Sequence, residues 1–231
     1  MEQKNTTFEN IKASLVEKGP LKIDVYQKIE SGFNLLKTVL AELESDLLKS
    51  MSGVDNRVVV KFSERGPFEL EFRISDDILI FSMHTDIFTF QEGNPLWKTS
   101  YLADNKMNSY SGIISVYNFL TDSLKFNRAN DIGVLIARIF VNRENHFFVE
   151  GKKQLGILFN DFEKDELTKS NLREIVESAI LFALNFDIIT PPFDQVKMIS
   201  VQELIEKNLA NVVSTGKRLG FKFQSDSEIK G

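Results

Sequence analysis

The side chains best suited to binding chemistry gather in one stretch of the sequence, residues 92–117. Its first twenty residues show no clear period, and a loop of that length inside a compact domain is commonly functional. Trp and Tyr offer a broad apolar face and one hydrogen-bonding group, a combination enriched at binding surfaces. The candidate partner- or ligand-binding residues are Trp97, Tyr101, Tyr110 and Tyr117. The alternative is a loop that its own aromatic side chains pin over the core.

Residues suited to catalysis or metal binding are sparse. The chain has two histidines, His84 and His146, and if neighbouring strands brought them together they could bind zinc with a carboxylate. The motifs of phosphate-binding loops, dinucleotide-binding folds, serine hydrolases and zinc proteases are all absent. We therefore expect no catalytic residue, no metal and no cofactor. An enzyme in which Asp76, Asp77 and Asp86 converge on His84 is the third hypothesis for function.

One acidic segment partly matches a calcium-binding loop, because Asp161, Glu163 and Asp165 place oxygens at alternate positions. Glu166 stands where that loop needs a glycine, and Leu172 stands where the bidentate glutamate belongs. Acidic residues before a helix are also favoured by the positive end of its dipole. An acidic loop leading into a helix is the simpler interpretation.

Composition and charge exclude several classes of protein. The net charge is −5, and no stripe of lysines forms the basic face that nucleic acid requires. There is no cysteine, so disulfides, thiol catalysis and cysteine-ligated metals are excluded. No apolar run approaches the roughly 18 residues of a membrane-spanning helix, and the amino terminus lacks a signal-peptide pattern. The sequence predicts a soluble cytoplasmic protein without a nucleic-acid or membrane partner.

The amino-terminal part is predicted to be helical. Capping-box patterns at Thr6 and Asp24, separated by Gly19-Pro20, predict two helices over 7–18 and 24–52. The second helix carries an apolar stripe whose spacing alternates between three and four residues. The stripe consists of Tyr26, Ile29, Phe33, Leu36, Leu40, Leu43 and Leu47. It predicts either the main core helix or a short coiled-coil seam, so a monomer and a homodimer both stay open.

The middle of the chain, residues 57–160, is predicted to form an antiparallel sheet of about seven or eight strands. Residues 68–74 alternate apolar and charged side chains, as a strand with one wet face does. Residues 142–145 and 151–153 are expected to be turns between later strands. Short apolar segments at 87–90 and 124–128 are counted among the strands.

Helical spacing returns after the sheet, with helices predicted over 170–186 and 201–215. Ser200 and Glu203 form a capping box for the second of these helices, after a break at Pro191-Pro192. Helices, then consecutive strands, then helices predict an α+β fold. No linker or repeat divides the chain, so one domain over 1–231 is expected.

Three hypotheses for function follow. The leading one is a non-catalytic binding or interaction protein that engages a protein partner through residues 92–117. The alternative is a carrier of a small apolar ligand, held between the sheet and the long helix and lined by some of the 20 phenylalanines. The enzyme hypothesis comes third.

Overall fold

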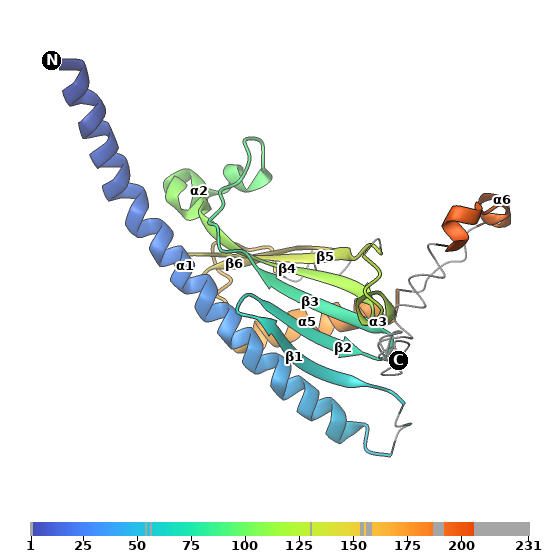
Figure 1. Ribbon diagram of the computed structural model, residues 1–231. Coiled ribbons are helices and arrows are strands. Elements are labelled where there is room, and N and C mark those ends of the chain that lie inside the picture. Colours follow the sequence, from blue (N-terminus) through green and yellow to red (C-terminus); the bar gives the residue numbers. More distant parts are fainter. Residues whose placement is uncertain are drawn as a thin grey trace, which may run out of the picture.

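The structure is a computed structural model that describes residues 2–53, 55, 57–129, 131–152, 155, 159–186 and 192–205. It is an α+β fold with a long amino-terminal helix and an antiparallel sheet, as predicted (Figure 1). In chain order the elements are α1 (Glu2–Ser50), β1 (Val60–Gly66), β2 (Glu69–Ile74), β3 (Asp77–Met83), η1 (Pro95–Lys98), α2 (Ser100–Asp104), η2 (Lys106–Ser109), β4 (Ser111–Leu120), α3 (Thr121–Lys125), β5 (Val134–Asn142), β6 (Phe147–Gly151), α5 (Lys169–Leu184) and α6 (Phe193–Val196).

The sheet is a meander in which each strand pairs antiparallel with the next along the chain. The part of the chain that is described contains six strands, in the order β1 to β6, so the predicted count of seven or eight was wrong. Residues 87–90 contribute only an isolated bridge between Phe88 and Ser111. Residues 124–128 are not a strand, because the Phe126 N–H bonds the Asp122 carbonyl and continues α3. Short apolar runs do not distinguish a strand from a helical turn by period alone.

A single helix, α1, replaces the two amino-terminal helices that were predicted. Thr6 and Asp24 lie inside it and are not caps. Pro20 removes one backbone donor, which leaves the carbonyl of Val16 without its usual intrahelical partner. Both residues are exposed, so water can bond that carbonyl. Gly19 is not among the residues with positive φ, so it does not form the left-handed cap that would end a helix.

The core lies between the sheet and two helices, α1 and α5, that cover one face of it. The predicted stripe of α1 forms one side of this core, because Ile29, Phe33, Leu36, Leu40 and Leu43 are all buried there. Every fully buried Leu or Phe side chain contributes about 1.5–3 kcal/mol relative to an exposed one. The prediction of a core helix is confirmed for this part of α1.

Helix α5 runs beside α1 and nearly matches its predicted bounds of 170–186. The Thr168 hydroxyl caps it by accepting the Asn171 N–H at 3.2 Å. The capping box predicted further on is also present, since the Ser200 N–H donates to Glu203 at 2.9 Å and the Glu203 N–H donates to Ser200 at 3.1 Å. Helical residues follow to 205, and residues 206–215 of that predicted helix lie outside the described residues.

We call the other face of the sheet, which α1 and α5 leave uncovered, the open face. Its side chains change in character from one edge to the other. Near β1 and β2 it carries a network of charges centred on Arg65. The guanidinium nitrogens of Arg65 lie 2.8 Å from a carboxylate oxygen of Glu69 and 2.9 Å from one of Glu71. At β5 and β6 it carries phenylalanine. None of the described helices has the length and apolar content to cross a membrane.

The approach of β4 to α1 gives a test of this packing. A Cβ atom at Gly112 would lie only 2.6 Å from Cβ of Ile29, so Gly112→Ala forces the helix away from the sheet. We expect it to lower the free energy of unfolding by roughly 1–3 kcal/mol in urea denaturation. Gly19→Ala is the matched control, since its Cβ would meet nothing within 4 Å. It should be neutral or stabilise by up to about 1 kcal/mol. Equal effects of the two substitutions would contradict this packing.

Candidate binding site on the open face

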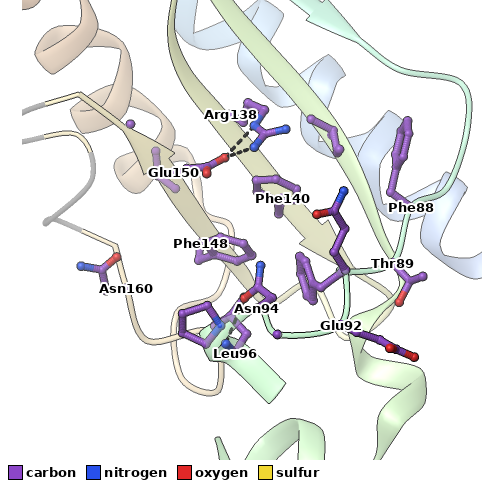
Figure 2. Close-up of a pocket in the computed structure, with 17 residues that line it drawn as sticks. Phe88, Thr89, Glu92, Asn94, Leu96, Arg138, Phe140, Phe148, Glu150 and Asn160 are labelled. Carbon is purple, nitrogen blue, oxygen red and sulfur yellow. Dashed lines mark hydrogen bonds and ion pairs between the residues drawn. The ribbon is translucent and has the colours of Figure 1, made fainter. Parts of the chain in front are cut away.

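A hollow of about 890 Å³ lies on the open face, between the segment 88–96 and strands β5 and β6 (Figure 2). Its size falls within the roughly 300–1,000 Å³ typical of ligand sites. The lining residues are Phe88, Thr89, Phe90, Gln91, Glu92, Gly93, Asn94, Pro95, Leu96, Ile113, Arg138, Phe140, Phe148, Val149, Glu150, Gly151 and Asn160.

The floor of the hollow is a cluster of phenylalanine rings. Phe140 and Phe148 are directly opposite each other on β5 and β6, and their rings stack with centroids 4.6 Å apart and planes inclined by 2°. Phe90 leans on both rings, at 5.8 and 5.6 Å. Phe162 closes the far side of the cluster, 5.0 Å from Phe148. Offset aromatic contacts of this kind contribute about 0.5–1.5 kcal/mol beyond area burial, so the floor is ordered before any ligand arrives.

One ion pair lies beside this aromatic floor. Arg138 and Glu150 are the next opposite pair on the same face of β5 and β6, two residues from the stacked rings, and the guanidinium Nε donates to a Glu150 carboxylate oxygen at 2.6 Å. The guanidinium also lies 5.3 Å from the centroid of the Phe140 ring. Because the pair is solvent-exposed, it adds at most about 1 kcal/mol to stability. Both charges are therefore available to a ligand at little cost to the fold.

A second hollow of about 320 Å³ lies on the strands beyond the ion pair. It runs over residues 135–138 and 150–152, and it shares Arg138, Glu150 and Gly151 with the larger hollow. We call the two hollows together the groove. The groove follows β5 and β6, with aromatic rings at one end and the ion pair where its two parts meet.

The rim segment 88–96 is held in place by backbone contacts and by Trp97. The backbones of Phe88 and Ser111 exchange hydrogen bonds of 2.9 and 2.8 Å, which fix the start of the segment on β4. The side chain of Asn94 accepts the Leu96 N–H at 3.0 Å and starts η1. The indole N–H of Trp97 donates to the Gln91 carbonyl at 3.0 Å. Trp97 thus braces the rim from outside the hollow.

We call residues 92–110 the covering segment. Tyr101 joins this segment to the turn between β5 and β6 by hydrogen bonds. Its hydroxyl donates to the Glu144 carboxylate at 2.5 Å and accepts the amide of Asn142 at 2.7 Å. Asn142 is fully buried, and its side-chain oxygen accepts the N–H groups of Glu144 and His146, both at 3.0 Å. Burial, and then the hydrogen bond to Glu144, raise the pKa of Tyr101. The hydroxyl therefore keeps its proton and remains a donor.

The other two candidate tyrosines lie elsewhere. Tyr110 ends η2 and is half-buried, whereas Tyr117 lies on β4 opposite Ile80 and Leu135. Tyr117 is four residues along the strand from Ile113, the lining residue on β4, which corresponds to about 13 Å. None of the four predicted residues lines the larger hollow. Trp97 and Tyr101 shape its covering segment, while the structure does not bring Tyr110 and Tyr117 to it.

The predicted histidine and carboxylate groupings do not assemble within the described residues. His84 follows β3 at one end and contacts Ser115 at 3.3 Å, while Asp76 and Asp77 lie at the other end of the same strand. Seven residues of strand separate the two ends by roughly 20 Å. In the acidic loop, Asp161 pairs with Lys164 at 3.0 Å. No group of three histidine or acidic side chains in the described part of the chain is arranged to hold a metal ion.

The residues that sequence reasoning missed are phenylalanines. Phe90, Phe140 and Phe148 form the floor of the hollow and Phe162 packs against them, whereas the sequence predicts phenylalanines only in a cavity between the sheet and the long helix. A signal was present in the turn predicted over 142–145. A hairpin closed by those four residues would place residue 140 opposite 147; the structure pairs 140 with 148, because the Asn142 N–H bonds the His146 carbonyl and the turn is one residue shorter.

The groove offers aromatic faces, an exposed ion pair and backbone groups for contact. The described lining of the larger hollow contains no histidine, serine or lysine. No protein-family model, curated protein or solved structure matches this chain.

Removing the hydroxyl of Tyr101 tests its role as a fastener. Tyr101→Phe leaves Asn142 and Glu144 without a shared partner, and we expect a loss of about 1–3 kcal/mol in the free energy of unfolding. Trp97, the only tryptophan, reports the transition by fluorescence. Tyr110→Phe is the control, because its hydroxyl has no hydrogen-bond partner among the described residues. If Tyr101→Phe were as stable as this control, the Tyr101 hydroxyl would not hold the covering segment in place.

The raised pKa of Tyr101 predicts a pH dependence at the alkaline end. A folded-state pKa above the unfolded value of about 10 means that the unfolded chain loses this proton first. The free energy of unfolding should therefore fall as the pH rises above about 10, and more steeply in the wild type than in Tyr101→Phe. Urea titrations at several alkaline pH values measure the two slopes. Parallel slopes would show that Tyr101 titrates alike in both states.

Proposed function

We propose that this chain is a non-catalytic binding protein whose working surface is the groove on the open face. The observation that supports this most directly is the stacked pair Phe140 and Phe148 beside the ion pair of Arg138 and Glu150: Phe140 is buried and holds Phe148, which is partly exposed. A partly exposed ring on a buried one, beside a pair of charges, suits a surface that binds an amphipathic occupant. The covering segment 92–110 supports one wall of this surface through Trp97 and Tyr101. Part of the region predicted to bind a partner would therefore support the binding surface.

The preferred occupant is an extended segment of a partner protein. The groove is open and elongated along two strands, with its charges partway along, which suits a chain that carries apolar and polar side chains in turn. The edge of β6 is not free to add a strand where it borders the groove, because the N–H groups of Phe147 and Val149 are already bonded to Asp165 and Phe159. Recognition would therefore rely on side chains across the face more than on added ladder hydrogen bonds.

A small apolar ligand is the second candidate. The larger hollow has a suitable volume and an aromatic floor. The space between the sheet and α1, proposed from the sequence, is filled by fully buried side chains such as Leu36, Leu40 and Phe81. Neither hollow described here is lined by α1. A ligand of this kind would therefore bind on the open face.

Site-specific cross-linking tests the groove as a surface for proteins. One variant carries the photoreactive residue benzoylphenylalanine in place of Glu92 on the rim of the groove. The control variant carries it in place of Leu48, an exposed residue of α1 that does not line the groove. In extracts of the native source, we expect discrete protein adducts from position 92 and none from position 48. Arg138→Glu should reduce the yield of adducts about tenfold, because losing an ion pair between Arg138 and the partner costs roughly 1.4 kcal/mol of binding free energy.

The outcomes separate the candidates. Adducts from both positions, or adducts from position 92 that Arg138→Glu leaves unchanged, would contradict the groove as the binding surface. Adducts with a small molecule in place of a protein, seen as a minor mass increase on position 92, would favour the second candidate.

A further inference from the structure

The amino-terminal part of α1 extends beyond the sheet (Figure 1). No side chain between Thr6 and Pro20 is buried, and the first buried residue is Leu21. We call residues 6–20 the overhang; at 1.5 Å per residue its length is about 22 Å. Phe8, Ile11 and Leu15 are 62%, 53% and 67% exposed on it. Large apolar side chains so exposed, one helical turn apart, form a face that nothing in the described chain covers.

This face continues the core stripe of the same helix. Phe8 and Leu15 belong to a seven-residue series that passes through the exposed Lys22 and reaches Ile29, Leu36 and Leu43, which are buried against the sheet. Residues seven apart lie on nearly the same side of an α-helix. The exposed apolar face of the overhang therefore points to the side of α1 on which the sheet is attached.

Charges on the overhang and in the turn that follows it, residues 21–24, are sorted by sign around the helix. At about 100° per residue, the lysines fall with Phe8, Ile11 and Leu15 within a sector of about 120°, and the acidic residues fall on the opposite side. The lysines are Lys12, Lys18 and Lys22, and the acidic residues are Glu9, Glu17 and Asp24; all are exposed. The only ion pair among them joins Lys12 to Glu9 at 4.0 Å. The apolar face is thus bordered by positive charge.

We propose that the overhang is a docking arm for an amphipathic helix of a partner protein whose apolar stripe is bordered by acidic residues. Complementary charge identifies this occupant, since three lysines border the three apolar side chains. A second copy packed face to face would bring the same lysines together, which is unfavourable. A flat membrane along this face would meet the sheet, which lies on the same side of α1. A helix is narrow enough to lie along the overhang beside the sheet.

The test uses the full chain and two synthetic helical peptides of three heptads. Both carry Leu at positions a and d; one carries Glu and the other Lys at positions e and g. In fluorescence anisotropy we expect the acidic peptide to bind at least about tenfold more tightly than the basic one, and more weakly as salt rises. Leu15→Asp, and the pair Lys12→Glu with Lys18→Glu, should each weaken binding of the acidic peptide about tenfold or more. These side chains are exposed, so the fold should be unaffected.

The control is the pair Glu9→Gln with Glu17→Gln on the opposite side of the helix, which should bind the acidic peptide as the wild type does. No binding of the acidic peptide, equal binding of both peptides, or unchanged binding after charge reversal would overturn the proposal. Adsorption to phosphatidylserine vesicles that Leu15→Asp abolishes would identify an anionic membrane as the occupant. A dimer in native mass spectrometry that Leu15→Asp dissociates would identify a second copy, and either result would also overturn the proposal.

Discussion

The close packing of α1 on one face of the meander is the constraint on which the rest of the structure depends. Gly112 lets β4 approach Ile29, and the stripe of α1 covers the centre of the sheet, with α5 beside it. A six-stranded sheet with only one face covered by helices needs some other cover for apolar residues on its second face. The segment 88–110 provides it over part of that face and leaves the groove along β5 and β6. The candidate site thus depends on α1 and α5 both packing on the other side of the sheet.

Within the open face, a single hairpin fixes the groove. Asn142, buried in the turn between β5 and β6, bonds two N–H groups of that turn and so sets the register of the two strands. That register stacks Phe140 on Phe148 and pairs Arg138 with Glu150. A slip of β6 by one residue would turn Phe148 and Glu150 to the helix-covered face, while β5 stays paired with β4. Tyr101 bonds the same asparagine, so the covering segment and the groove floor share one anchor.

Much of this architecture was predictable from local patterns, and the failures have physical causes. The stripe from Ile29 to Leu43 and the box at Ser200 each depend on neighbours in sequence, and both appear in the structure. Pro20 was interpreted as a break because one missing backbone bond is costly in a buried helix, but here water reaches the free carbonyl. The groove could not be predicted in the same way, because Phe90 and Phe162 reach Phe148 only through tertiary packing. Trp97 and Tyr101 were predicted to bind a partner because of their residue types, yet they support the site from outside the hollow.

The distribution of charge relates the two proposed surfaces to each other. The chain carries a net charge of −5, so its average field repels an acidic partner. Lysines on the overhang oppose that field locally, in a part of α1 that projects away from the sheet. In the groove, by contrast, Arg138 is neutralised by Glu150, and Glu92 has no ion-pair partner among the described residues. An acidic helix would therefore be steered to the overhang and away from the groove, where Glu92 adds negative charge. The two proposed surfaces would therefore bind segments of different charge.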